Sequence, residues 1–221
     1  MDLSESLSSA FEYSRAFFSR WLDWLILIVL TIIPIVDFIV IGYYAKVLRD
    51  DGSSKAPPKI EGYPEMFWDG LKAVLVALIY GIPVLIIWVA IGFSSLIPVA
   101  IVFIIIFIVE LMAIVHMFKT RSFGNAFDLG EIFNVIGKIG WLQYLGFLII
   151  YIILFAIVGA IVDLFAILSI IGIIIGLALS VLVTTFLYRS IGLLYDNAMG
   201  NGRAAVPGIS PVPPETPAPT P

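Results

Sequence analysis

Two long stretches of the chain, residues 72–118 and 141–188, consist almost entirely of Ile, Leu, Val, Phe, Ala and Gly. Each is far longer than the ~20 residues that one helix needs to cross a bilayer, so each predicts a pair of membrane-spanning helices. We expect the first pair at about 72–93 and 96–118. In the second stretch we expect the chain to turn at Ser169 to Gly172.

A shorter amphipathic segment precedes each apolar hairpin, which gives three blocks at about 5–50, 63–119 and 123–199. Such a helix lies along the membrane–water interface before the chain enters the bilayer. The segment at 123–139 shows the pattern most clearly. Its polar positions are Asp128, Glu131, Asn134 and Lys138, and its apolar positions are Phe127, Ile132, Phe133, Ile136 and Ile139. The sequence thus predicts an all-α polytopic membrane protein with five or six membrane segments.

Turn and cap residues predict where these segments begin and end. Pro64-Glu65 is typical of a first helical turn and should open the second block. The third block should begin near Asn125, whose side chain would cap the helix together with Asp128 three residues later. We expect the first outer turn at Phe93-Ser94-Ser95, and the last helix should end at the glycine-rich Gly200-Asn201-Gly202.

The first and third blocks also resemble each other. Ala10-Phe11-Glu12 is followed by Trp21-Leu22-Asp23-Trp24-Leu25, and Ala126-Phe127-Asp128 is followed by Trp141-Leu142-Gln143-Tyr144-Leu145. Two explanations stay open. The blocks are either a parallel internal repeat, as many membrane proteins have, or independent helix starts that share aromatic anchors at the interface.

The apolar part of the first block, residues 22–48, allows two arrangements. A single span would bury Asp37 near the middle of the membrane, at a cost of about 3 kcal/mol, and Pro34 would interrupt its helix. A hairpin that turns at Pro34 to Asp37 places both residues in the turn. We favour the hairpin, whose arms are short enough to be re-entrant, and the single crossing stays the alternative.

Composition supports this class. The chain of 221 residues is 61% hydrophobic and 13% charged, whereas a soluble domain averages about 45–50% apolar and about 25% charged. The net charge of −4 indicates no special partner, and the absence of Cys excludes disulfides and thiolate chemistry. We expect no cleavable signal peptide, because the first residues lack an apolar core that ends in small residues.

The distribution of charge predicts the orientation. The twelve Lys and Arg residues lie near the ends of the predicted segments. The positive-inside rule therefore places the 49–72 and 119–140 loops in the cytoplasm, together with the C-terminal tail. We expect residues 1–200 to form one helical membrane domain. Residues 201–221 are rich in Pro without apolar periodicity, which predicts a disordered tail.

Glu110 is the one candidate functional residue. It lies inside a predicted span, where an ionisable group is costly and suggests a site for a proton or cation. The alternative is a neutral carboxyl or one that is hydrogen-bonded to Tyr80, Thr184 or Thr185. His116, the single histidine, cannot form a metal site alone. The sequence carries no phosphate-binding loop and no hydrolase or metalloprotease motif. It also has no basic–aromatic cluster of the kind that binds nucleic acid.

The stretch IIPIVDFIVIGYYAKVLRD, followed by PPKIEGYPEMFWDGLKA, carries a family resemblance, to which AFDLGEIFNVIGKIGWLQYL adds a second block. The chain resembles the archaeal and bacterial membrane family called domain of unknown function 4013. It departs from the expected pattern at Tyr63-Pro64-Glu65, where we expect Leu-Pro-Glu. The resemblance implies no activity, since none is assigned to the family. The residues that carry it are Pro34, Gly42-Tyr43, Lys46, Arg49, Pro64-Glu65 and Gly70-Leu71-Lys72-Ala73.

These observations favour a non-enzymatic scaffold or accessory protein of the cell membrane, without catalytic residues, metal or cofactor. Its partners would be the lipid bilayer and a membrane protein or a second copy of the chain, and no nucleic acid. The alternative is a small transporter or channel subunit that uses Glu110. The two functions predict different interiors. A scaffold should have a dry interior packed with Gly and Ala, whereas a transporter should have several polar groups that converge on Glu110.

Overall fold

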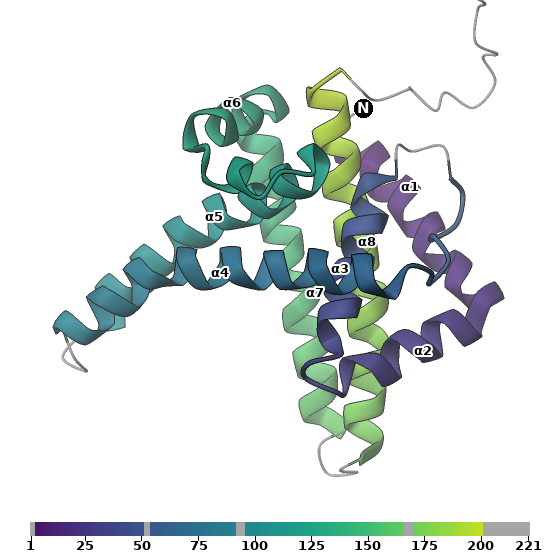
Figure 1. Ribbon diagram of the computed structural model, residues 1–221. Coiled ribbons are helices and arrows are strands. Elements are labelled where there is room, and N and C mark those ends of the chain that lie inside the picture. The colour runs from purple at the N-terminus through teal and green to yellow at the C-terminus, as the bar shows by residue number, and fades with distance from the viewer. Residues whose placement is uncertain (1–2, 51–53, 92–95, 166–169, 201–221) are drawn as a thin grey trace, which may run out of the picture.

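The computed structural model describes residues 3–50, 54–91, 96–165 and 170–200, and all regular elements within these ranges are helices (Figure 1). Two short 3-10 helices, η1 (Ala16–Arg20) and η3 (Gly124–Phe127), connect the longer ones. The α-helices are α1 (Leu3–Arg15), α2 (Trp21–Thr31), α3 (Asp37–Arg49), α4 (Tyr63–Ile91), α5 (Leu96–Thr120), α6 (Leu129–Ile139), α7 (Trp141–Phe165) and α8 (Ile170–Ala198).

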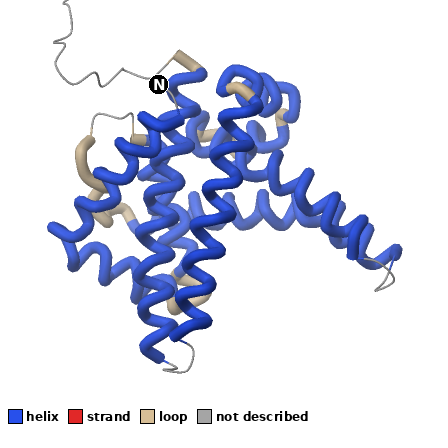
Figure 2. The backbone as a smooth tube through the Cα atoms, turned by 180° about the vertical axis from the view of Figure 1, so that it is seen from behind, coloured by secondary structure: helices blue, strands red, loops and turns tan. Residues whose placement is uncertain are grey.

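Four of these helices are long and apolar enough to cross a membrane, namely Tyr63–Ile91, Leu96–Thr120, Trp141–Leu164 and Gly172–Ala198. They form two hairpins, α4–α5 and α7–α8, whose far ends diverge, as Figures 1 and 2 show from opposite sides. The expected count of five or six membrane segments is not confirmed. Helices α2 and α3 have only 11 and 13 residues, so they span about 17 and 20 Å of a hydrocarbon core of about 30 Å.

The predicted break at Pro34 to Asp37 is present. Helix α2 ends at Thr31 and α3 begins at Asp37. The intervening residues form a tight turn in which the Val36 amide donates to the Ile33 carbonyl at 2.9 Å. Residues 22–48 are therefore not one continuous helix, and the choice between a hairpin and a single crossing stays a prediction. The side of the membrane on which the N-terminus lies stays a prediction.

Two predicted boundaries need correction. Helix α6 is capped by Asp128, whose carboxylate accepts a hydrogen bond from the Glu131 amide at 3.1 Å. Asn125 instead lies in η3, because the chain makes a 3-10 turn before the helix begins. The turn expected at Ser169 to Gly172 is not present at Ile170 to Gly172, which belong to α8, and Ser169 lies outside the described residues.

Other predictions fall partly outside the described residues. Phe93-Ser94-Ser95 lies there, as do Asn201, Gly202 and the tail at 201–221. Gly200 is described, and its φ of 73° places it in the left-handed region, as a glycine that ends a helix requires.

The proposed repeat agrees with the fold only in part. Trp21 and Trp141 each begin a helix that follows a shorter helical segment. Ala10-Phe11-Glu12, however, lies inside α1, whereas Ala126-Phe127-Asp128 spans η3 and the cap of α6. The similarity is thus restricted to the helix starts.

Helix α3 lies between α4 and α8 and touches both through glycine. A Cβ atom at Gly42 would overlap the Met66 carbonyl group, and one at Gly70 would overlap the carbonyl group of Phe38. On the other side of α3, a Cβ at Gly192 would lie 2.9 Å from the Leu48 carbonyl oxygen. Small residues at such positions let membrane helices approach backbone to backbone.

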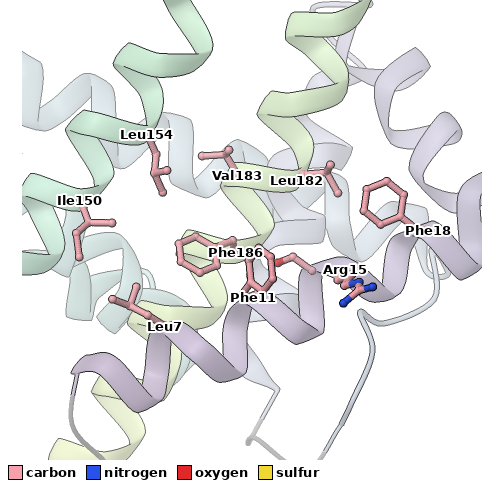
Figure 3. A pocket seen from close by; sticks show the side chains of 10 residues that line it. Leu7, Phe11, Arg15, Phe18, Ile150, Leu154, Leu182, Val183 and Phe186 are labelled. Atoms are coloured by element: carbon pink, nitrogen blue, oxygen red, sulfur yellow. The ribbon is translucent and has the colours of Figure 1, made fainter.

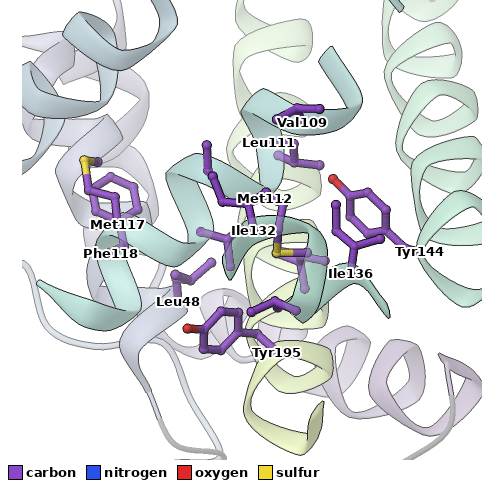
Figure 4. Packing of buried hydrophobic residues seen from close by; sticks show 14 of the residues in the cluster. Leu48, Val109, Leu111, Met112, Met117, Phe118, Ile132, Ile136, Tyr144 and Tyr195 are labelled. Carbon is purple, nitrogen blue, oxygen red and sulfur yellow. The ribbon is translucent and has the colours of Figure 1, made fainter. Parts of the chain in front are cut away.

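The larger apolar core lies where α6 closes over the ends of α5, α7 and α8 (Figure 4). Met112 from α5, Ile132 and Ile136 from α6, and Tyr144 from α7 are completely buried there. The Tyr144 hydroxyl donates to the Ile108 carbonyl at 2.7 Å, so its polar atom is satisfied inside the core. This packing holds the two hairpins together at one end of the molecule.

Candidate functional site

Glu110 lies in α5, half-buried, between the two hairpins. Its charge acts on the hydroxyl groups of Tyr80, Tyr151 and Tyr188, which come from α4, α7 and α8. Within the part of the chain that the structure describes, however, the Glu110 carboxyl makes no hydrogen bond or ion pair. The tyrosines therefore surround the carboxyl without binding it.

The hydrogen-bond partners expected for Glu110 are engaged elsewhere. The Tyr80 hydroxyl donates to the Ala126 carbonyl at 2.8 Å. Thr185 donates to the Val181 carbonyl of its own helix at 2.8 Å, and Thr184 bonds with the Tyr44 hydroxyl. Each of these three hydroxyl groups thus has a hydrogen-bond partner other than Glu110.

His116 lies on α5 two turns closer to the end of the helix, and it contacts α8 instead of Glu110. Its Nδ1 atom lies 2.8 Å from the Tyr195 hydroxyl. No group of three His, Asp or Glu side chains among the described residues is placed to hold a metal ion. His116 is therefore paired with Tyr195 and does not form a site with Glu110.

The strongest polar feature is a set of three buried ion pairs at the end of the bundle opposite the hairpin tips. We call this set the charged layer. Its pairs are Arg49–Asp69 at 2.6 Å, Lys119–Asp196 at 2.5 Å and Arg189–Asp50 at 2.9 Å. They join α3 to α4, α5 to α8, and α8 to the residue that follows α3.

Arg189 is the centre of the charged layer. Its guanidinium donates to the carbonyl oxygens of Asp50 at 3.1 Å and Ser54 at 3.2 Å, in addition to its ion pair. It also lies 4.3 Å above the ring of Tyr13, which connects α1 to the layer. Its Nε atom has no partner among the described residues. Breaking this arrangement would leave a buried charge uncompensated, which is costly.

Tyr13 completes this arrangement as a donor. Its hydroxyl lies 3.2 Å from Asp50 Oδ2. Burial, and next the neighbouring Asp50 carboxylate, raise the pKa of Tyr13 well above its ordinary value. The phenol therefore stays neutral and donates a hydrogen bond to the carboxylate across the working pH range.

A cavity of about 350 Å³ opens beside the charged layer, lined by residues that include Arg49, Lys119, Arg121, Tyr195 and Asp196. Arg49 and Lys119 already have carboxylate partners. Arg121 follows the last residue of α5 with a φ of 56°, in the left-handed conformation that ends a helix. Arg49 and Lys119 thus balance acidic groups, and Arg121 lies at a helix C-terminus, where a positive charge is favourable. Among the described basic lining residues only Arg121 lacks a carboxylate partner, so no cluster of free cations defines an anion site.

The charged layer was not predicted from the sequence, although the sequence contains a signal for it. Arg189 stands between Tyr188 and Ser190 near the end of a long apolar helix. A basic residue at this position, like Glu110, predicts a partner inside the protein, because a buried charge must be compensated. Its partner Asp50 could not be named, since it is 139 residues away along the chain.

Four helices long and apolar enough to cross a membrane, together with an apolar exterior, are typical of an α-helical, polytopic membrane protein. More particularly, the chain belongs to the family described as Protein of unknown function (DUF4013), whose model matches residues 25–184. The match runs from α2 into α8 and confirms the resemblance carried by the Gly42-Tyr43 region. No curated protein and no solved structure matches the chain.

Proposed function

We propose that the protein is a non-enzymatic scaffold or accessory protein of the cell membrane. The observation that carries this proposal is the charged layer. It uses buried charge to tie helices to one another, whereas Glu110, the ionisable residue between the hairpins, has no ion-pair partner among the described residues. A transport path would need polar groups that line it from one side to the other.

The packing of α3 supports the same function. Direct backbone contacts at Gly42 and Gly70 on one side, and at Gly192 on the other, leave no space between α3 and its neighbours. Closely packed cores resist gradual deformation. A protein of this kind presents a rigid polar end, to which α1, α6 and residues 54–62 contribute, to a membrane protein partner or a second copy.

The positive-inside rule supports a cytoplasmic position for that end, together with the tail at 201–221. Helices α2 and α3 would then enter the membrane from the cytoplasmic side and return. The two arms of this re-entrant hairpin would be a fifth and a sixth membrane segment, neither of which crosses the bilayer.

A second candidate function is proton or cation transport through Glu110. The observation that favours it is the position of a half-buried carboxyl in a spanning helix, with tyrosines from three other helices around it. Against it stands the absence of a bonded partner for Glu110 within the described ranges.

Flux through the purified protein in liposomes separates the two functions. We expect the wild type to conduct neither protons nor monovalent cations above empty liposomes, and Glu110→Gln to behave in the same way. Asp163→Asn, which removes an exposed carboxyl near the end of α7, is the matched control. Wild-type flux that Glu110→Gln abolishes and Asp163→Asn preserves, at unchanged thermal stability, would establish transport and overturn the scaffold proposal.

A further inference from the structure

An apolar groove of about 460 Å³ runs between α1 and the α7–α8 hairpin (Figure 3). Ile150 and Leu154 form its α7 side, and Val183 and Phe186 are among the residues of its α8 side. Arg15, on α1, is the one charged residue that lines it. In Figure 3 the Arg15 side chain lies at the end of the groove away from Ile150.

The groove exists because α1 contacts α7 at one point and then diverges from it. At the start of α1, the Leu3 side chain lies 3.4 Å from the position that a Cβ at Gly146 would take. Beyond α1 the chain is held against α8, where the Trp24 indole donates to the Ala178 carbonyl at 3.1 Å. The groove lies between these two contacts.

In a bilayer, the exposed side of this groove would face lipid, because two of its walls are helices of membrane-spanning length. Two walls are the spans of α7 and α8. The third is the amphipathic helix α1, whose Phe11 lines the groove with 62% of its surface exposed, and η1 adds Phe18, which also lines the groove and is 62% exposed. Large apolar side chains on such a helix insert into the boundary between headgroups and acyl chains.

In a bilayer, the Arg15 end of the groove would lie at the level of the lipid headgroups, because it is close to a polar loop. Nearby Arg20 donates to the Pro57 carbonyl at 2.6 Å, which anchors η1 beside the polar loop that carries Lys55 and Lys59. Arg20 itself is neutralised by Asp23. Arg15, by contrast, is exposed and has no ion-pair partner among the residues that the structure describes.

We propose that this groove binds one acyl chain of an anionic phospholipid whose phosphate group pairs with Arg15. The apolar walls exclude polar ligands. The Arg15 guanidinium, a single unpaired cation at one end of the groove, is complementary to a single anionic headgroup. The proposal rests on the membrane location of the protein and not on its role as a scaffold. A failure here would therefore leave the flux experiment unaffected.

Native mass spectrometry of the full chain in a mild detergent tests this site, with phosphatidylglycerol and phosphatidylcholine of matched acyl chains as probes. We expect one tightly bound phosphatidylglycerol per protein, preferred over phosphatidylcholine by roughly fivefold, which corresponds to the contribution of one basic residue near an anionic headgroup. Arg15→Gln should abolish this preference. Lys59→Gln, which removes one charge from the neighbouring loop, should preserve it.

A second pair of variants tests the groove itself. Ile150→Trp places a larger side chain among the lining residues and should weaken binding of both lipids by a similar factor. Ile149→Trp makes the same change at the next residue, which is exposed and does not line the groove, and should bind like the wild type. Equal affinity of the wild type for both lipids, or unchanged binding by Ile150→Trp, would overturn the proposal. A lipid-free dimer would assign the groove to a second copy and would overturn it as well.

Discussion

Loss of the Asp50 charge should destabilise the protein more than loss of any carboxylate in an exposed ion pair. Arg189 and Asp50 have side chains that are only 2% and 8% exposed, and their charged atoms lie 2.9 Å apart. At an effective dielectric constant of ~20, the attraction between unit charges at this distance is about 6 kcal/mol. Most of this attraction offsets the cost of removing both groups from water.

Asp50→Asn removes the attraction and leaves Arg189 buried with its desolvation cost uncompensated. Breaking a buried pair in this way costs about 3–5 kcal/mol. We expect the lower end, about 3 kcal/mol, because the Asn amide oxygen can still accept one hydrogen bond. The free energy of unfolding would be measured by denaturant titration of the purified protein in detergent micelles.

The matched control is Asp23→Asn. Asp23 pairs with Arg20, but the two side chains are 25% and 29% exposed. Exposed pairs contribute about 0–1 kcal/mol, so this variant should lose no more than that. The double variant Asp50→Leu with Arg189→Met should regain most of the loss, since a well-packed apolar pair can replace a buried ion pair. If Asp50→Asn and Asp23→Asn lose the same free energy, the charged layer does not stabilise the fold as we infer.

Three further predictions concern packing, pH and capping. Gly42→Ala should destabilise the protein by about 1–3 kcal/mol, because the new Cβ would overlap the Met66 carbonyl group. Gly137→Ala has open space around it and should instead stabilise the protein by about 0.5–1 kcal/mol. Equal effects of the two variants in the same denaturant titration would contradict this. Because burial raises the pKa of Tyr13 above its ordinary value of 10.0, the neutral phenol stabilises the fold fully below pH 10 and this contribution declines as the pH rises above it. Tyr13→Phe should therefore reduce the loss of stability measured between pH 10 and 12, and an unchanged alkaline profile would count against this role. Asp128→Ala should cost about 1 kcal/mol by removing the cap of α6, and an unchanged circular dichroism signal and melting temperature would show that the cap is dispensable.

The helices of this fold could be predicted because their information is local. An uninterrupted apolar run specifies a span, and the break at Pro34 follows from a proline and an acid that a span would bury. The resemblance around Gly42-Tyr43 also depends on contiguous residues. Asp128 was identified as part of a cap, although as the partner of Asn125, because both residue types favour the same position.

The polar contacts could not be predicted because they join residues far apart in the sequence. Arg189 and Asp50 are 139 residues apart, and Lys119 and Asp196 are 77 apart. Taken singly, each of these residues fits the flank of a membrane segment, where charge is expected. Only the packing of α3 between α4 and α8 shows that they meet in a buried layer. Glu110 was the more conspicuous residue in the sequence, but the structure gives it fewer partners.

Helix α6 shows how one sequence pattern can satisfy two environments. Its apolar stripe is wider than the bundle can bury. Ile132 and Ile136 are fully buried against α5 and α8, whereas Phe133 remains 44% exposed and packs with its ring centroid 6.2 Å from that of Trp141. An exposed Phe beside an exposed Trp suits the membrane interface, where aromatic side chains concentrate. Glu131, by contrast, lies on the polar side, where its carboxylate accepts a hydrogen bond from the Asn134 amide. The two faces together support a position of α6 at the membrane surface, with the charged layer just beneath it.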